Sequence, residues 1–214
     1  MSATTTPLPS LSVFFPCYNE ADNLPSLLNQ ALLVLPKLAK KFEIIVVDDG
    51  SSDETVEVVE KFSTQISNIK LVHHETNLGY GSALRTGLKT AKYDWIFFTD
   101  GDGQFDLHEL EAFVQQANRG VQAILGYRRQ RAEGAKRALM AKLYKLYIDL
   151  LFRVHVKDID CAFKLFKAEA VRSLPLFSTG AFISAEMLYR LKKKRVKFVQ
   201  LPVNHYLRKH GSST

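Results

Sequence analysis

FEIIVVDDGSSD, from Phe42 to Asp53, is the stretch of sequence that decides the fold. Its first part, Phe42 to Val47, is rich in β-branched residues, as is typical of a strand buried on both faces of a parallel sheet. Asp48 to Asp53 supplies turn and cap residues, and a helical pattern of apolar residues follows as far as Phe62. The stretch therefore predicts a buried strand that leads directly into an amphipathic helix.

The same strand and helix unit recurs along the chain. Apolar runs predict further strands at residues 11–15, 69–73, 93–99, 121–125, 162–166 and 197–203. Helical periodicity predicts helices at residues 24–35, 82–91, 107–119, 134–152 and 184–194. Such alternation predicts an α/β fold with a Rossmann-like, mostly parallel sheet, right-handed crossovers and flanking helices.

Polar clusters follow three of the predicted strands, at Pro16 to Glu20, Asp48 to Asp53 and Asp100 to Gln104. Ligands of open α/β sheets bind at the carboxyl ends of the strands. We therefore expect the three clusters to converge on one site.

Composition indicates one globular domain. The chain has 214 residues, of which 46% are hydrophobic and 24% charged. Residues 1–10 carry no signal-peptide pattern and predict a disordered leader, so we expect a single domain over residues 11–214. No apolar run approaches the ~20 residues needed to cross a bilayer, which favours a cytoplasmic protein. The two cysteines, Cys17 and Cys161, predict reduced thiols rather than a disulfide framework.

The net charge of +7 would suit any polyanion. Arg and Lys are concentrated between Arg128 and Lys145, so we expect the partner's anions to meet the second half of the chain. Guanidinium groups here could hold a phosphate, and the alternative is a solvated basic face. No basic surface interleaved with aromatic residues supports nucleic-acid binding.

DGDGQ, from Asp100 to Gln104, carries the clearest chemistry. Two carboxylates and one amide oxygen after a strand offer hard oxygen ligands for Mg²⁺ or Mn²⁺, and such an ion could bridge a diphosphate. The alternative is an acidic, glycine-rich turn. Asp48 to Asp53 likewise could cap a helix and also present a carboxylate to a nucleobase or ribose. The loop from Asn77 to Ser82 could bring backbone close to a ligand or only turn sharply.

In this order, the motifs resemble those of the family 2 glycosyltransferases, which have the GT-A fold, and among them the dolichol-phosphate mannose synthases and polyprenyl-phosphate glucosyltransferases. The resemblance covers residues 11–214. It is carried by FPCYNE from Phe15 to Glu20, by Asp49, by NLG from Asn77 to Gly79 and by DGDGQ. Later segments add GYR at Gly126 to Arg128, DIDCAFK at Asp158 to Lys164, and the closing stretch around Arg208.

The resemblance assigns site residues to two halves of the domain, a nucleotide-sugar half at 11–105 and an acceptor half at 106–214. It implies that the nucleotide sugar is bound by Pro16, Tyr18, Glu20, Asp49, Asp100, Lys164 and Arg208. It implies metal ligands at Asp100, Asp102 and Gln104, and an acceptor-phosphate site at Arg128, Arg131 and Arg137. Of these, Asp102, Arg128 and Arg137 are the expected catalytic residues.

The expected reaction is a metal-dependent, inverting single displacement that moves a hexose from GDP-mannose or UDP-glucose to a polyprenyl or dolichyl phosphate. A lipid phosphate is already ionised at neutral pH, so this transfer requires no protein base. If the acceptor were a sugar or protein hydroxyl, Glu186 or Asp160 would be the candidate base. A non-catalytic nucleotide-sugar-binding subunit is the other alternative.

A lipid acceptor implies a protein that binds peripherally to the cytosolic face of a membrane. The predicted helix at 134–152 is amphipathic and basic, and either lies against anionic lipid or packs on the core. Relatives usually continue beyond the position of Thr214 into an amphipathic or membrane-spanning tail, so part of the attachment is expected outside this sequence. The donor base and the oligomeric state stay open at this stage.

Overall fold

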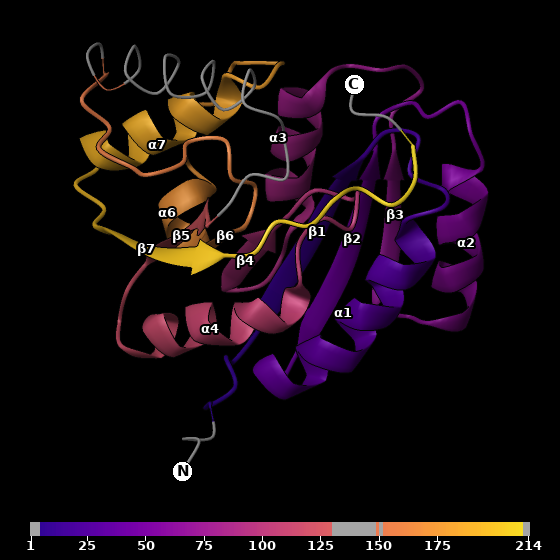
Figure 1. Cartoon of the computed structure of the whole chain (residues 1–214), viewed down its shortest axis with the longest axis horizontal. Coiled ribbons are helices and arrows are strands. Elements are labelled where there is room, and N and C mark those ends of the chain that lie inside the picture. The colour runs from indigo at the N-terminus through magenta and orange to yellow at the C-terminus, as the bar shows by residue number, and fades with distance from the viewer. Residues whose placement is uncertain (1–4, 130–148, 150–151, 212–214) are drawn as a thin grey trace.

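The structure, a computed structural model, describes residues 5–129, 149 and 152–211. In chain order its elements are β1 (Leu11–Cys17), α1 (Leu24–Leu38), β2 (Phe42–Asp48), α2 (Thr55–Gln65), β3 (Ile69–His73), α3 (Tyr80–Thr90), β4 (Trp95–Phe98), the 3-10 turn η1 (Leu107–Glu109), α4 (Leu110–Asn118), β5 (Ala123–Arg128), β6 (Lys164–Lys167), α6 (Ala168–Val171), α7 (Ile183–Lys193) and β7 (Phe198–Val203). Figure 1 shows their arrangement, and none of the described helices is long and apolar enough to span a bilayer.

The strands form one sheet of seven, in the order β3-β2-β1-β4-β6-β5-β7. Strands β1 to β4 pair in parallel, as do β5 and β7, and only β6 runs antiparallel to both of its neighbours, β4 and β5. The predicted mostly parallel α/β sheet is confirmed. Because β1 lies between β2 and β4, the carboxyl ends of these three strands meet at one edge of the sheet.

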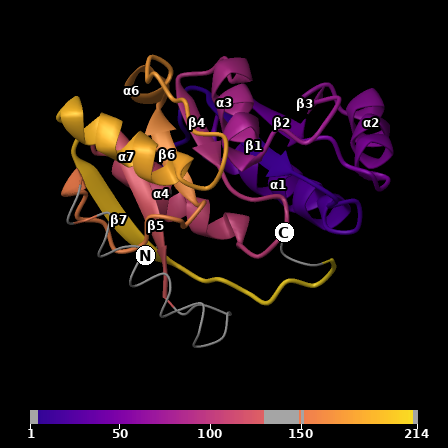
Figure 2. The same cartoon turned by 90° about the horizontal axis from the view of Figure 1, so that it is seen from above.

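Helices cover both faces of the sheet. On one face α1, α4 and Val59 of α2 pack against alternate strand residues such as Val13 and Ile44. On the other face α3, α6 and α7 pack against the intervening residues, including Phe14 and Ile45. Figure 2 shows α1 and α3 on opposite sides of the sheet. Burial on both sides explains why β2 has so few polar residues.

The predicted disordered leader is wrong for residues 5–10. Leu8 is 1% exposed and bridges in parallel to Ala39, and its backbone N–H donates to the carbonyl of Leu38 at 2.8 Å. The Ser10 hydroxyl donates to Asp94 at 2.8 Å. An apolar side chain with a place in the core and paired backbone groups outweighed the Ser, Thr and Pro content of the segment.

Element boundaries differ from the predictions by a few residues. The predicted helix at 107–119 begins as η1, where the Asp106 carboxylate accepts a hydrogen bond from the backbone N–H of His108 at 2.9 Å. The helix predicted at 82–91 begins earlier, at Tyr80, directly after Gly79, whose φ of 91° ends the preceding loop. The helix predicted at 134–152 lies almost wholly outside the described residues.

Candidate active site

A cavity of ≈340 Å³ opens where the carboxyl ends of β1, β2 and β4 meet. Its lining combines all three predicted polar clusters with residues of the α3 loop and of the C-terminal segment: Pro16, Cys17, Tyr18, Glu20, Asp49, Asn77, Tyr80, Ala83, Asp100, Gly101, Asp102 and Arg208. The predicted convergence of the clusters on one site is confirmed. Parallel strands bring these segments together although they are spread over most of the chain.

Asp100 and Asp102 form the acidic centre of this cavity. Burial, together with the charge of Asp102, raises the pKa of Asp100 to about 7. Burial also raises the pKa of Asp102, although its Oδ1 accepts a hydrogen bond from the backbone N–H of Gln104 at 3.0 Å. The Tyr80 hydroxyl donates to Asp100 at 3.0 Å, which favours the ionised form. A bound cation would stabilise the ionised forms of two carboxylates whose pKa values burial raises.

The C-terminal segment 204–211 passes along the mouth of the cavity. It runs from β7 back towards the first half of the sheet in Figures 1 and 2. Gln104 fixes it at two points, because its Nε2 donates to the carbonyl of Tyr206 at 2.7 Å and its carbonyl accepts the Tyr206 N–H at 2.9 Å. Arg208 Nη2 donates to Glu20 at 2.8 Å, so the guanidinium is held inside the cavity rim.

Glu20 connects this segment to β1 and α1. Asn23 Nδ2 donates to its second carboxylate oxygen at 2.7 Å, and the same amide donates to the carbonyl of His210. Burial raises the pKa of Glu20, while Asn23 and Arg208 act against that rise. The predicted donor-site residues Pro16, Tyr18, Glu20 and Arg208 are therefore all brought to one cavity.

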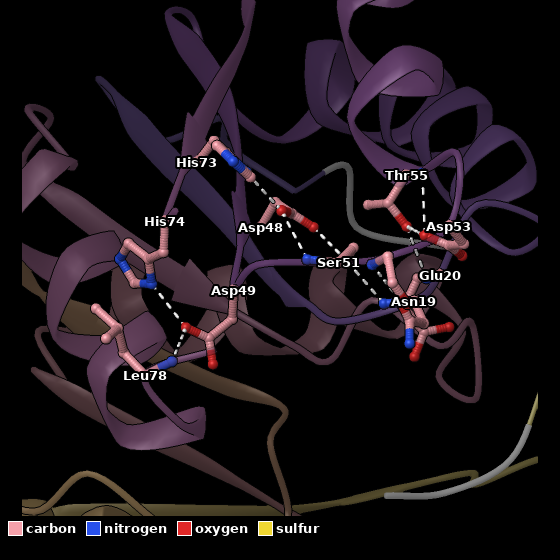
Figure 3. A network of polar contacts seen from close by, with 11 residues as sticks. Asn19, Glu20, Asp48, Asp49, Ser51, Asp53, Thr55, His73, His74 and Leu78 are labelled. Carbon is pink, nitrogen blue, oxygen red and sulfur yellow. Dashed lines mark hydrogen bonds and ion pairs between the residues drawn. The ribbon is translucent and has the colours of Figure 1, made fainter. Parts of the chain in front are cut away.

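Asp49 holds the loop between β3 and α3 against the end of β2. Its Oδ1 accepts the backbone N–H of Leu78 at 3.0 Å, and its Oδ2 accepts that of Gly79 at 2.8 Å. His74 Nδ1 contacts Oδ1 at 2.7 Å, as Figure 3 shows. Asp49 also lines the cavity, so it both fixes a loop and faces the cavity.

The neighbouring residues of the 48–53 cluster stabilise local structure, as the capping alternative predicts. Asp48 accepts hydrogen bonds from the backbone N–H of Ser51 at 3.2 Å and from the Ser51 hydroxyl, and His73 Nδ1 contacts it at 2.8 Å (Figure 3). Asp53 accepts the backbone N–H of Thr55, the first residue of α2, at 3.0 Å. Within this cluster, Asp49 is thus the carboxylate that lines the cavity.

Of the predicted acceptor-phosphate residues, the structure describes only Arg128, and Arg131 and Arg137 lie outside the described residues. Arg128 Nε and Nη2 donate to the two carboxylate oxygens of Asp158 at 2.7 and 3.0 Å. The Arg128 side chain is only 9% exposed. It lies close enough to the acidic centre for its charge to lower the pKa of Asp100.

Lys164 does not line the cavity, and its predicted contact with the nucleotide sugar stays a prediction. Its side chain is buried under the preceding loop, where Nζ donates to the carbonyls of Ile159, at 3.1 Å, and of Cys161. Burial lowers the pKa of Lys164. Lys164 is 1% exposed in the antiparallel strand β6, and its charge lowers the pKa of Asp100.

Glu186, a candidate base for a hydroxyl acceptor, stabilises a loop. Although burial raises its pKa, hydrogen bonds from Ser178, Arg190 and Phe177 hold the pKa of Glu186 at about 2. Both carboxylate oxygens accept the backbone N–H of Phe177 at 3.1 Å, and Arg190 pairs with one of them at 2.8 Å. So acidic a carboxyl group is a poor proton acceptor at neutral pH.

Tyr80, His74 and Asp158 contact predicted site residues, although no motif in the sequence predicts a role for them. Tyr80 lay inside the glycine-containing loop and His74 next to a strand end, but neither matched a motif that required it. Asp158 begins the DIDCAFK segment, for which the sequence offers only a family resemblance. Their positions follow from which strands are neighbours, and chain order alone does not give that.

The family model described as Glycosyl transferase family 2 matches residues 12–174. The chain is 29% identical to the glycosyltransferase AglD of Haloferax volcanii over 212 residues, covering 95% of this chain and 34% of that protein. It is also 29% identical to an undecaprenyl-phosphate 4-deoxy-4-formamido-L-arabinose transferase of Aeromonas hydrophila, covering 97% and 63%. A dolichyl-phosphate beta-glucosyltransferase of Dictyostelium discoideum is 29% identical, with 91% and 65% covered. The chain thus spans between a third and two thirds of each relative.

Solved structures of glucosyl-3-phosphoglycerate synthase from Mycobacterium tuberculosis have the same fold. Its complex with phosphoglyceric acid has a TM-score of 0.73 at 20% identity, covering 95% of this chain and 73% of that chain. Its complex with Mn²⁺, UDP and glucosyl-3-phosphoglycerate has a TM-score of 0.71 at 19% identity, with 95% and 73% covered. The predicted GT-A fold is confirmed by this likeness.

Proposed function

We propose that this chain, which belongs to glycosyl transferase family 2, is an inverting glycosyltransferase that moves a hexose from GDP-mannose or UDP-glucose to a polyprenyl or dolichyl phosphate. The observation that carries the proposal is the acidic centre of the cavity. Asp100 and Asp102 stand there at the end of β4, with Asp49 and Arg208 in the same lining. This set offers a cation site, a base-facing carboxylate and a phosphate-binding guanidinium together.

A nucleotide-sugar donor is supported by the shape and charge of the cavity. Arg208 at the rim can pair with a diphosphate, and Pro16, Tyr18 and Asp49 can contact the nucleoside. Structures of the synthase with the same fold contain UDP or UDP-glucose together with Mn²⁺, which supports the same class of donor here.

A divalent cation, Mg²⁺ or Mn²⁺, fits the residues present. Burial and the charge of Asp102 raise the pKa of Asp100, and a bound cation would favour the ionised form of both carboxylates. We assign Asp102, Asp100 and the amide oxygen of Gln104 as its ligands. When bound, the ion would stabilise charge on the diphosphate that leaves. Among the described residues, no group of three or more His, Cys, Asp or Glu side chains could hold a metal ion. The proposed site therefore combines two carboxylates with the amide oxygen of Gln104.

A phosphate acceptor is supported by the relatives' names and by the lack of a suitable base at Glu186. Two of the relatives act, by name, on undecaprenyl phosphate and dolichyl phosphate. Arg128, held by Asp158 near the acidic centre, is assigned to the acceptor phosphate, with Arg131 and Arg137 as its proposed partners. An ionised phosphate oxygen can attack the anomeric carbon without losing a proton.

The chain's own residues then act mainly by positioning and by charge. Arg128 orients the attacking phosphate on one side of the sugar, and Arg208 holds the diphosphate on the other. Attack opposite the departing diphosphate inverts the anomeric centre. Segment 204–211 contributes Arg208 to the lining of this cavity.

Peripheral association with the cytosolic face of a membrane is part of the same proposal, because a polyprenyl phosphate resides in a bilayer. Phe177 and Phe182 are 70% and 42% exposed, and the cations Lys192 and Lys193 lie at the end of α7. The exposed rings lie before the start of α7 and the two lysines at its end, and both kinds of side chain suit the surface of an anionic membrane.

The test is a transfer assay on the full chain with labelled UDP-glucose or GDP-mannose and dolichyl phosphate in detergent micelles. We expect a labelled lipid product that chelation abolishes and that added Mn²⁺ or Mg²⁺ restores. Dolichol without its phosphate is the matched control and should accept nothing. Transfer to a sugar or protein hydroxyl instead would establish the first alternative, and nucleotide binding without any turnover would establish a non-catalytic subunit.

A further inference from the structure

Asp49 has already committed most of its hydrogen-bonding capacity to the protein. An ionised carboxylate accepts about four hydrogen bonds, two at each oxygen. Oδ1 accepts two, from the backbone N–H of Leu78 and from His74, and Oδ2 accepts one, from the backbone N–H of Gly79. One acceptor position therefore remains, on Oδ2, in a residue that lines the cavity.

His74 must be the donor in its contact with Asp49, because a carboxylate has no hydrogen to give. The other ring nitrogen, Nε2, lies 2.9 Å from the hydroxyl of Thr86 in α3. A neutral ring with its hydrogen on Nδ1 satisfies both contacts, since Nε2 can accept from Thr86. The contacts with Asp49, which Figure 3 shows, and with Thr86 together fix the ring against Oδ1.

We infer that the cavity selects a uracil nucleotide over a guanine nucleotide, because Asp49 can accept one base hydrogen bond and no more. The inference rests on the proposed function, in which Asp49 faces the nucleobase. Uracil offers a single N–H, at N3, between two carbonyl oxygens. Guanine offers two adjacent donors, N1–H and the N2 amino group, and would need both carboxylate oxygens. The amino group of a bound guanine would lose its hydrogen bond to water and gain none from Asp49.

Asn77 supplies the complementary donor. Its Oδ1 accepts the backbone N–H of Gly79 at 3.1 Å, which orients its amide nitrogen away from that contact. Asn77 lines the cavity together with Asp49. One free acceptor position and one amide donor in the same lining match the N3–H group of uracil and a carbonyl oxygen next to it.

The surrounding backbone prevents Asp49 from turning to free a second acceptor position. A Cβ at Gly50 would lie 2.4 Å from the carbonyl carbon of Thr76, so the 49–50 turn and the 76–79 loop are in close contact. On the other side, a Cβ at Gly79 would lie 2.7 Å from the carbonyl oxygen of Thr179. Because the 76–79 loop is packed on both sides, the N–H groups of Leu78 and Gly79 stay bound to the Asp49 carboxylate. The preference for uracil over guanine follows from that rigidity.

The test is calorimetric binding of UDP, CDP, GDP and IDP to the full chain in the presence of Mn²⁺. GDP is expected to bind about tenfold to a hundredfold more weakly than UDP, the range for a buried donor left without a partner. IDP differs from GDP only in lacking the N2 amino group, so it should bind more tightly than GDP. CDP matches UDP in size but presents a lone pair at N3, so it should bind weakly.

His74 and His73 provide a matched pair of variants. His74→Ala frees a position on Oδ1, so it should narrow the preference for UDP over GDP and the preference for IDP over GDP. His73→Ala removes a ring that contacts Asp48 instead and should leave both ratios unchanged. A purely structural role of His74 would weaken all nucleotides equally and leave the ratios as they are, which contradicts the inference.

The outcomes distinguish a failure of the uracil inference from a failure of the proposed function. GDP binding as tightly as UDP, or IDP binding no better than GDP, would overturn the uracil inference and leave the glycosyltransferase proposal standing. Failure of all four nucleotides to bind in a chain with an intact fold would overturn the proposed function, and the inference with it. Circular dichroism of each variant establishes that the fold is intact.

Discussion

The hydroxyl of Tyr80 donates a hydrogen bond to Oδ1 of Asp100 across 3.0 Å, which joins the first turn of α3 to the end of β4. Burial and the charge of Asp100 raise the pKa of Tyr80 well above its ordinary value, so the hydroxyl stays a donor throughout the physiological range. The bond opposes the burial and repulsion that raise the pKa of Asp100 to about 7. Tyr80 therefore adjusts the charge of the acidic centre near neutral pH.

Tyr80→Phe is expected to shift the pH dependence of metal-assisted donor binding towards alkaline pH. Without the hydroxyl, the pKa of Asp100 rises above about 7. Asp100 then stays protonated up to a higher pH, and a cation must compete with that proton. The measurement is the affinity for UDP with Mn²⁺ between about pH 5.5 and 9, where affinity should rise with pH in both proteins. Tyr93→Phe, a tyrosine outside the cavity lining, is the control. Coincident profiles would show that the hydroxyl has no influence on Asp100.

Asp102→Asn should abolish transfer while leaving the fold at least as stable as before. The substitution removes the charge that raises the pKa of Asp100, so Asp100 ionises at lower pH. A carboxyl whose folded pKa is raised contributes stability at low pH that is lost as the pH rises through about 7. The variant should therefore match or exceed the parent in thermal stability at pH 8. Transfer at the parental rate would refute the assignment of Asp102 to the metal.

Arg128→Ala and Arg208→Ala should separate the acceptor and donor roles. Arg208 lies at the cavity rim, so its loss should raise the KM for the nucleotide sugar about tenfold or more, as expected for a lost charge-assisted bond. Arg128 pairs with Asp158, and its loss should act on the KM for the lipid phosphate. Because Arg128→Ala leaves Asp158 unpaired, Arg128→Lys provides a milder comparison. Equal effects of both substitutions on both substrates would contradict the division.

Glu186→Gln is expected to destabilise the protein by about 2 kcal/mol at neutral pH, the range for hydrogen bonds to a charged group. The pKa of Glu186 is lowered to about 2, so its stabilisation is present above about pH 4.5 and is lost as the pH falls towards about 2. The difference between variant and parent in urea unfolding should therefore shrink in acid. Glu169→Gln, at a side chain that is 61% exposed, should have little effect at any pH. A difference independent of pH would show that the charge of Glu186 is not what stabilises the loop.

Gly50→Ala should cost about 2–4 kcal/mol, whereas Gly120→Ala should cost about 1 kcal/mol. Both glycines have positive φ, at 74° and 85°, so both substitutions strain the backbone. Only at Gly50 would the added Cβ also collide with backbone, that of Thr76 and Asn77, while nothing lies within 4 Å at Gly120. Chemical unfolding measures both. Gly50→Ala should in addition weaken UDP binding, because it displaces the loop that Asp49 holds.

Much of the fold could be predicted from local pattern. The run from Phe42 to Val47 predicts a strand buried on both faces, and β2 is such a strand, because side chains alternate between the two faces of a sheet and both faces are covered. The clusters at Glu20, Asp49 and Asp102 could be assigned to one edge because parallel strands end at the same side. The composition of residues 1–10 predicts a disordered segment, but composition does not reveal that the side chain of Leu8 has a place in the core.

The sequence by itself determined the alternation of strands and helices, the polar clusters at strand ends and the residue types able to bind a cation and a diphosphate. These properties depend on neighbours in the chain, over which periodicity and turn chemistry act. Only the tertiary structure decided that Lys164 points into the protein, that His74 and the 78–79 backbone occupy three of the four acceptor positions of Asp49, and that Tyr80 meets Asp100. Each of these contacts joins segments whose distance in space is set by the order of strands in the sheet, and many chain orders are compatible with the same local pattern.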